Sequence, residues 1–137
     1  MATYKAPLRD MQFVMQDLIN FEKHYQSLPA CDEVNQELID AILDEASKFA
    51  EEILAPLYAV GDEVGCTMTD GGEVQTPPGF KEAYEQYIEG GWPSLDQPAR
   101  YGGQDLPMSI GLPVREMNGT ANWSWAMYPG LSHGAME

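Results

Sequence analysis

One long apolar stripe constrains the fold of this chain more than any other feature. Its members recur at three- and four-residue steps over about five helical turns and share one helix face: Leu38, Ile42, Ala46, Phe49, Ile53 and Leu57. Acidic side chains fill the positions between them, as on the solvent face of an amphipathic helix. We expect Asp32 to be the N-cap of this helix. Pro56 should kink or end it, with Gly61 available as the stop.

Shorter periodic segments predict further helices. We expect a first helix from near Pro7 to before Pro29, one opened by Pro77-Pro78-Gly79 and closed by Gly90-Gly91, one over 108–120 with Pro113 as an irregularity, and one from about 122 onwards. Asp70-Gly71 predicts a small hairpin or extended loop near 65–77. The sequence contains no strand-rich block. The expected fold class is therefore all-α, an up-and-down bundle of about five helices with one short excursion.

The charge and size of the chain limit its partners and its domain count. The net charge is -15 at pH 7, from 22 acidic and 7 basic side chains. Such a charge opposes binding to a nucleic acid backbone or to an anionic lipid surface. With 137 residues, 44% of them hydrophobic, the chain can build one core. We expect one domain over 1–137 that binds neither nucleic acid nor membrane.

The cysteines and the start of the chain indicate a compartment. Cys31 and Cys66 lie far apart and lack the C-x-x-C spacing and histidine partners of a zinc site. The N-terminal segment has no apolar core of an export signal, and no apolar run approaches bilayer length. We therefore expect two reduced thiols, no bound metal and a cytoplasmic protein.

Few side chains suggest chemistry by themselves. Ser132 and His133 are neighbours on a predicted helix, so they point about 100° apart and no third group orients them. A surface or interface role is the simpler interpretation of His133, and a helix-end role that of His24. Gly102-Gly103 lacks the strand-turn-helix context of a phosphate-binding loop and fits a backbone turn. We therefore predict no catalytic group from spacing alone.

Glu116 leaves two interpretations open. It could act as a general base, but such a glutamate is more often a structural ion-pair partner, here of Arg100 or Arg115. The last residues, 135–137, carry neither a C-cap glycine nor a basic last turn. We therefore expect the chain to be a piece of a larger protein.

The order of several short motifs carries a resemblance. These are Ala55-Pro56, Gly61-Asp62, Gly79-Phe80-Lys81-Glu82-Ala83-Tyr84, Gly90-Gly91-Trp92, Tyr101-Gly102-Gly103-Gln104, Glu116-Met117 and Pro129-Gly130-Leu131-Ser132-His133-Gly134. Together they resemble the N-terminal helical domain of the acyl-CoA dehydrogenase family. Residues 4–10 and 77–80 are similar to its larger bacterial branch, which includes 3-methylmercaptopropionyl-CoA and fatty acyl-CoA dehydrogenases.

The resemblance implies an enzyme of three parts. A middle β domain and a C-terminal helical domain would follow this one, with FAD between them, and both are absent from this chain. The full-length enzyme would be a homo-oligomer that dehydrogenates an acyl-CoA thioester and passes electrons to an electron-transfer flavoprotein. The family's catalytic glutamate and FAD-binding segments match nothing here. We therefore assign no catalytic, cofactor or metal residue, and expect the fragment alone to be inactive.

The resemblance also implies that this domain supplies a wall of the acyl-chain pocket. Carried onto matching positions, that wall consists of Trp125, Tyr128, Pro129, Ser132 and His133. The first four lie at i, i+3, i+4 and i+7, which places them on one helical face. Trp123 and Trp125 would shorten or reshape a pocket, in favour of a short or branched acyl group. Equally, these aromatic residues could form the bundle core.

A second function class stays open. The chain could be a self-standing acidic helical module that binds a protein partner through its aromatic terminal helix. In either case, apolar surface around Trp92, Trp123, Trp125 and Tyr128 should be exposed in the chain alone. We then expect self-association or fraying of the last helix.

Overall fold

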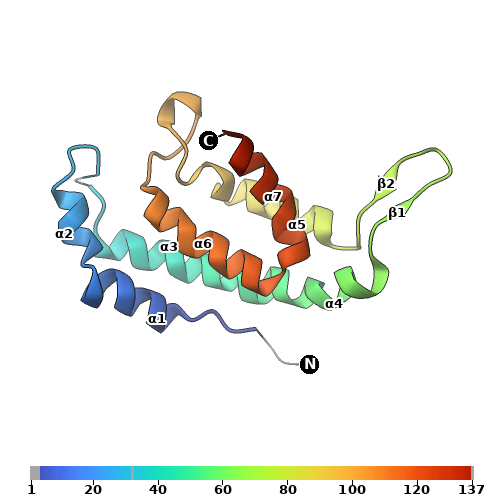
Figure 1. The fold of residues 1–137 in the computed structure, drawn as a ribbon, viewed down its shortest axis with the longest axis horizontal. Coiled ribbons are helices and arrows are strands. Elements are labelled where there is room, and N and C mark those ends of the chain that lie inside the picture. Colours follow the sequence, from blue (N-terminus) through green and yellow to red (C-terminus); the bar gives the residue numbers. More distant parts are fainter. Residues whose placement is uncertain (1–3, 32, 137) are drawn as a thin grey trace.

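The structure, a computed structural model, describes residues 4–31 and 33–136. Its α-helices are α1 (Leu8–Gln12), α2 (Phe21–Gln26), α3 (Gln36–Lys48), α4 (Ala55–Val64), α5 (Phe80–Glu89), α6 (Met108–Ala121) and α7 (Trp123–Met136). Helix α3, the π-helical segment Phe49–Leu54 and α4 form one long rod, and α6 lies beside it (Figure 1). The expected all-α helical bundle is confirmed.

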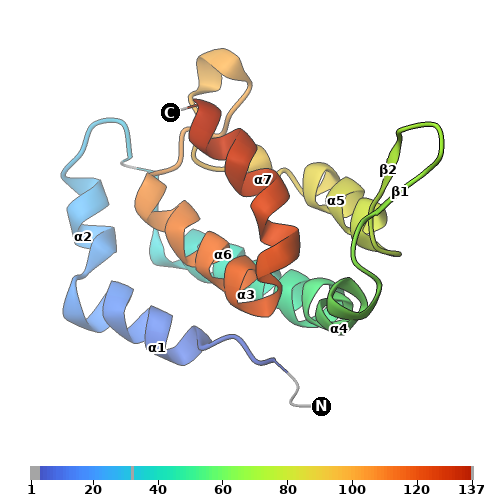
Figure 2. The same ribbon diagram turned by 45° about the vertical axis from the view of Figure 1, so that its right-hand side comes forward.

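Figure 2 shows how the remaining elements surround this pair. Helix α7 turns away from the C-terminal end of α6 at an angle, α5 lies to the side of α7 next to the hairpin, and α1 and α2 lie at the opposite end from the hairpin. The core is apolar and forms between the long rod, α5, α6 and the first turn of α7. Its fully buried larger side chains include Tyr25, Ile39, Leu43, Leu54, Ile110, Met117 and Trp125. No helix in the described part of the chain is long and apolar enough to cross a membrane.

The prediction of one continuous first helix is wrong. It divides into α1, a π-helical segment Phe13–Leu18 and α2. The break lies at Asn20, whose left-handed backbone (φ 56°, ψ 62°) no helix can continue. Asparagine adopts this conformation more readily than most residues, and its side chain then accepts a hydrogen bond from Lys23 N at 3.2 Å. Asn20 therefore ends one helix and caps the next.

The long helix exists, but its predicted limits need correction. Asp32, the expected N-cap, lies outside the described residues, and Asn35 caps α3 by accepting from Leu38 N at 2.9 Å. Pro56 does not end the helix, because it follows a π-helical segment and lies in the first turn of α4, where a missing N–H is tolerated. The helix ends at Gly65, which has φ 64°. Gly61 instead lies inside α4, where a Cβ atom would be 2.7 Å from Phe80 Cζ.

The core face of the long helix also differs from the predicted stripe. The buried apolar residues are Ile39, Leu43, Ala46, Ala50 and Leu54, and the stripe identified in the sequence shares only Ala46 with them. Its other members are only partly buried or exposed. The long helix therefore carries two adjacent apolar stripes, of which one packs into the core and the other lies at its edge.

The hairpin and the two C-terminal helices are confirmed. Strands β1 (Thr67–Met68) and β2 (Val74–Gln75) are antiparallel, with Thr67 opposite Gln75. Helix α5 begins after Gly79 (φ 83°), where Leu57 leaves no room for a Cβ atom, and ends before Gly90. Helices α6 and α7 contain internal prolines, Pro113 and Pro129. They follow each other with only Asn122 between them.

Candidate functional site

Helix α7 carries all five residues of the wall that the resemblance implied. Asn122, which is buried, fixes the start of this helix. Its Oδ1 accepts from the backbone N–H of Trp125 at 3.1 Å, and its Nδ2 donates to the carbonyl oxygen of Leu54 at 3.2 Å. One amide therefore caps α7 and ties it to the long rod.

Trp125 lies in the core. The side chain is 0% exposed, and its indole N–H donates to the carbonyl oxygen of Phe80 at 3.1 Å. Its ring meets Phe49 and Tyr87 edge-on, with centroids 5.8 Å and 5.5 Å apart. Of the two roles that the sequence left open for this tryptophan, its burial favours the bundle core.

Pro129 and His133 meet in a cleft between α6 and α7. The cleft has a volume of about 360 Å³ and is lined by Tyr87, Arg115, Asn118, Gly119, Trp123, Ala126, Met127, Pro129, Gly130, Leu131 and His133. Apolar side chains of α7 form most of one wall, while Arg115 and His133 make one end polar. A mostly apolar cleft with a few polar groups suits a ligand with an apolar body.

Tyr128 and Ser132 do not line this cleft. Tyr128 lines a separate hollow of about 470 Å³ together with Val74, Thr76, Phe80, Lys81 and Tyr84. Its hydroxyl lies 3.6 Å from Cys66 Sγ, and this hydrogen bond raises the pKa of Tyr128. Ser132 is exposed and lines a small third hollow, which Pro129 and His133 also line. The face predicted from i, i+3, i+4 and i+7 spacing therefore divides between the core, the cleft and two further hollows.

The polar end of the cleft is built on one buried carboxylate. Asp96 has a side chain only 3% exposed, and its Oδ2 lies 2.5 Å from Arg115 Nη1. His133 Nε2 lies 3.2 Å from Asp96 Oδ1 and 3.0 Å from Arg115 Nη1. The imidazole can donate to the carboxylate when Nε2 carries a proton and accept from the guanidinium when it does not. We call Asp96, Arg115 and His133 the Asp96 cluster.

Neither arginine has the partner proposed from the sequence. Arg115 pairs with Asp96, and the guanidinium of Arg100 lies 4.8 Å from the ring centre of Tyr101. Within the described residues, neither forms an ion pair with Glu116, which is exposed. The structure therefore gives Glu116 no role at the cleft.

Two further polar side chains border the cleft. Tyr87 is buried, and burial raises the pKa of its hydroxyl to about 12, so this group stays protonated at neutral pH. Asn118 Oδ1 is also buried and has no hydrogen-bond partner among the described residues. An unpaired buried acceptor is unfavourable, so this oxygen retains unused hydrogen-bonding capacity beside the cleft.

Motif reasoning did not identify several residues that the structure brings to the cleft. Met127 and Leu131 follow Trp123 at steps of four, a helical spacing that could have revealed them. Asp96 gave no such signal, because it lies in a loop and meets His133 across 37 residues of sequence. Spacing therefore finds neighbours on one helix but not those contributed by a loop.

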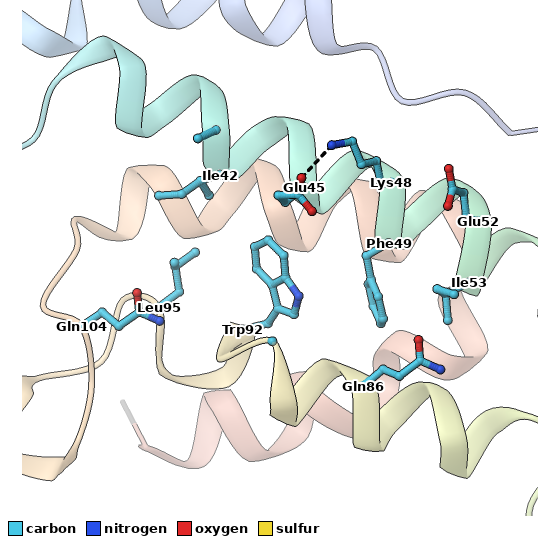
Figure 3. A pocket seen from close by; sticks show the side chains of 12 residues that line it. Ile42, Glu45, Lys48, Phe49, Glu52, Ile53, Gln86, Trp92, Leu95 and Gln104 are labelled. Carbon is cyan, nitrogen blue, oxygen red and sulfur yellow. Dashed lines mark hydrogen bonds and ion pairs between the residues drawn. The ribbon is translucent and has the colours of Figure 1, made fainter.

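A larger open groove lies on another side of the bundle. It has a volume of about 620 Å³ and runs between the long rod and α5 (Figure 3). Ile42, Phe49 and Ile53 of the partly buried stripe line it, facing Trp92, and Glu45 and Lys48 form an ion pair at its edge. None of the five wall residues lines it. Within the described part of the chain, no group of three or more histidine, cysteine or acidic residues could hold a metal ion, and both cysteines are free thiols.

Comparison with known proteins gives two relatives. The chain is 35% identical over 135 residues to 3-methylmercaptopropionyl-CoA dehydrogenase of Ruegeria pomeroyi, covering 98% of the chain and 23% of that protein. It is 30% identical over 140 residues to butyryl-CoA dehydrogenase of Syntrophomonas wolfei, covering 96% of the chain and 22% of that protein. No family model matches the chain. The chain thus spans about a quarter of the length of these curated relatives.

Proposed function

Since the chain is related to the acyl-CoA dehydrogenases along almost its entire length, we propose that it is the N-terminal helical domain of an FAD-dependent enzyme of that kind. The observation that carries this proposal is the 35% identity over 98% of the chain to 3-methylmercaptopropionyl-CoA dehydrogenase. The reaction would be the oxidation of an acyl-CoA thioester between Cα and Cβ. This domain would supply a surface for the acyl group and none of the catalytic groups.

The α6–α7 cleft is the part of the domain that supports this role. Trp123, Met127 and Leu131 would contact the acyl chain and exclude water from it. Pro129 and His133 would close the same wall, while Trp125 supports the helix from the core. Tyr128 and Ser132 would contact substrate only on the neighbouring surface of α7. The bulk of Trp123 favours a short or branched acyl group.

The residues of the cleft do not fit the flavin that the family implies. A flavin diphosphate needs cationic side chains or unpaired backbone amides. Arg115 lines the cleft, but its guanidinium is already paired with the buried Asp96 carboxylate at 2.5 Å. We therefore place FAD, the catalytic base and their chemistry in other domains of the full-length protein.

The partners of the full-length protein follow from the same proposal. They would be an acyl-CoA substrate, an electron-transfer flavoprotein as electron acceptor, and further copies of the enzyme in a homo-oligomer. The acidic surface of the chain, with its net charge of -15, suits a cytoplasmic enzyme better than one held on anionic lipid.

The test uses the full-length protein encoded by the reading frame that contains this chain. We expect purified protein to be yellow and its flavin absorbance to bleach anaerobically on addition of butanoyl-CoA or 3-(methylthio)propanoyl-CoA. Met127→Arg would place a charge in the cleft wall and should raise KM for the thioester at least about tenfold. Met68→Arg, on the exposed hairpin, is the matched control and should leave KM unchanged. A flavin-free protein that oxidises no acyl-CoA would contradict the proposal.

One observation favours the second function class. Trp123, Leu131 and Met136 are exposed large apolar side chains on a single helix, as expected of a surface that covers a partner. An interaction module would give a colourless full-length protein that elutes together with another protein. The flavin spectrum therefore separates the two functions directly.

A further inference from the structure

Three segments far apart in the sequence meet at the carboxylate of Asp96. The loop that carries Asp96, helix α6 with Arg115 and helix α7 with His133 come together there. We infer that Asp96 is a positioning residue that holds the C-terminal half of α7 in place, and with it one wall of the cleft. The importance of that wall for substrate rests on the proposed function, while the positioning itself does not.

Both oxygens of the carboxylate are used in this arrangement. Oδ2 accepts from Arg115 Nη1 at 2.5 Å, and Oδ1 lies 3.2 Å from His133 Nε2. Because the side chains of Asp96 and His133 are only 3% and 16% exposed, water competes weakly for these contacts. Loss of the carboxylate would leave Arg115, whose side chain is only 28% exposed, without its acidic partner, which is unfavourable for a partly buried charge.

The loop around Asp96 is itself fixed by hydrogen bonds. Leu106 N donates to Leu95 O at 3.2 Å, and Gln104 N donates to Ser94 O at 2.9 Å. Across the same loop, the Asp105 carboxylate accepts from Ala99 N at 2.9 Å. The Asp96 carboxylate is therefore presented from a preorganised support, which lowers the conformational entropy lost on contacting His133.

Helix α6 makes room for the carboxylate at Gly111. A Cβ atom at this position would overlap Asp96 Oδ2 and lie 2.9 Å from Arg115 Nη1. Glycine inside a helix is less favourable than alanine. Here a glycine allows the Asp96 carboxylate to approach the helix backbone closely, so Gly111 makes the contacts of the Asp96 cluster possible.

The far half of α7 depends on this contact. Trp125 is the buried side chain of the helix, and 126–136 contain no further buried residue. Pro129 removes one backbone N–H from the same stretch. His133 lies two turns beyond Trp125, where the Asp96 cluster joins the helix to both α6 and the loop. Without it, the segment after Pro129 would open more often.

Hydrogen exchange of the 137-residue chain tests the inference. In Asp96→Asn, backbone amides of 130–136 should exchange at least about tenfold faster, while amides of α3 keep their rates. Asp70→Asn is the matched control, because it makes the same substitution at an exposed position of the hairpin that belongs neither to the Asp96 cluster nor to its loop. The ¹⁵N chemical shift of His133 Nε2 should change in Asp96→Asn and stay unchanged in Asp70→Asn.

Gly111→Ala provides a second variant that preserves all three members of the Asp96 cluster. Alanine favours the helix by itself, so a general structural effect would slow exchange or leave it unaltered. The inference predicts faster exchange over 130–136, because the new Cβ displaces the carboxylate. Unchanged exchange in both variants, with the chain folded, would overturn it. A functional flavoenzyme with that result would leave the proposed function intact, whereas a flavin-free protein with loosened variants would overturn the proposed function alone.

Discussion

Helices α6 and α7 are alike in sequence terms and opposite in their packing. Each has 14 residues and an internal proline. Helix α6 buries Ile110, Gly111, Val114, Met117, Asn118 and Ala121, whereas the buried residue of α7 is Trp125. The buried apolar positions of α6, Ile110, Val114, Met117 and Ala121, recur at three- and four-residue steps, and α6 packs along the long rod. Length and composition therefore do not decide which helix belongs to the core.

The difference shows how α7 is held. It is fixed at its start by Asn122, in its first turn by Trp125 and near its end by the Asp96 cluster. Between these points its apolar side chains remain exposed, with Trp123 at 67% and Leu131 at 69%. A helix held at separate points and apolar elsewhere is suited to form a wall against another domain or a ligand.

The largest effect is expected from Trp125→Ala, which removes the side chain that anchors α7 in the core. Removal of this fully buried indole leaves a cavity and removes its hydrogen bond to the Phe80 carbonyl oxygen, which should lower the free energy of unfolding by about 3 to 5 kcal/mol. Trp123→Ala removes the same side chain type from an exposed position two residues away and should cost less than about 1 kcal/mol. Urea denaturation measures both. Equal losses would mean that α7 is not anchored through Trp125.

The next largest loss of stability is expected at high pH, from the ionisation of Tyr87, whose ring packs against Trp125. Burial raises the folded-state pKa of Tyr87 to about 12, against about 10 in an unfolded chain. The unfolded state therefore loses its proton first as pH rises. The protonated Tyr87 hydroxyl therefore contributes about 2 to 3 kcal/mol to the free energy of unfolding. This contribution is present below pH 10 and is lost progressively up to about pH 12.

Tyr87→Phe provides the control for this prediction, because it removes the titrating hydroxyl and retains the ring. The unfolding free energy of this variant should fall less between about pH 9 and pH 12 than that of the native chain. Denaturant melts at a series of pH values provide the measurement. If the unfolding free energies of the two chains fall in parallel with pH, the loss of stability at high pH comes from groups other than Tyr87.

Substitutions of the two buried asparagines, Asn122 and Asn118, should differ in their effect on stability. Asn122 caps α7, whereas Asn118 lies on α6 beside the cleft. Asn122→Ala removes the cap of α7 and the bond to Leu54 O, and should cost about 2 kcal/mol. Asn118→Leu replaces an amide whose Oδ1 has no partner among the described residues, and should change stability by less than about 1 kcal/mol. Thermal unfolding compares the variants. A larger loss from Asn118→Leu would reverse the assignment.

Local signals predicted the elements whose ends are set by a single residue. Gly79 and Gly90 bound α5 as expected, because a left-handed backbone or a helix end is encoded where it occurs. The break at Asn20 gave no comparable signal, since the apolar spacing continues across it. The stripe on the long helix was displaced from the core face because Ile42 and Leu43 are neighbours about 100° apart. Periodicity identifies two such stripes but cannot say which one meets α6.

The candidate site was predictable only as far as the resemblance reaches. It directed attention to α7, and two of its five residues, Pro129 and His133, line the cleft. Trp125 instead packs in the core, which depends on its contacts with Phe80 and Tyr87 of α5. The role of Asp96 could not be predicted from the sequence, because its contacts with Arg115 and His133 are determined by the tertiary fold.

Leu131→Gln should have the smallest effect on stability and the clearest effect on association. This leucine is 69% exposed on the cleft side of α7, so the change should alter the free energy of unfolding by no more than about 0.5 kcal/mol. If the exposed apolar face drives self-association of the chain alone, the polar side chain should shift the oligomer towards monomer in size-exclusion chromatography with light scattering. Met68→Gln, at a position on the hairpin that is 74% exposed, should leave the oligomeric state unchanged. A native chain that is monomeric at all concentrations, and binds no dye for apolar surfaces, would show that the face of α7 needs no cover.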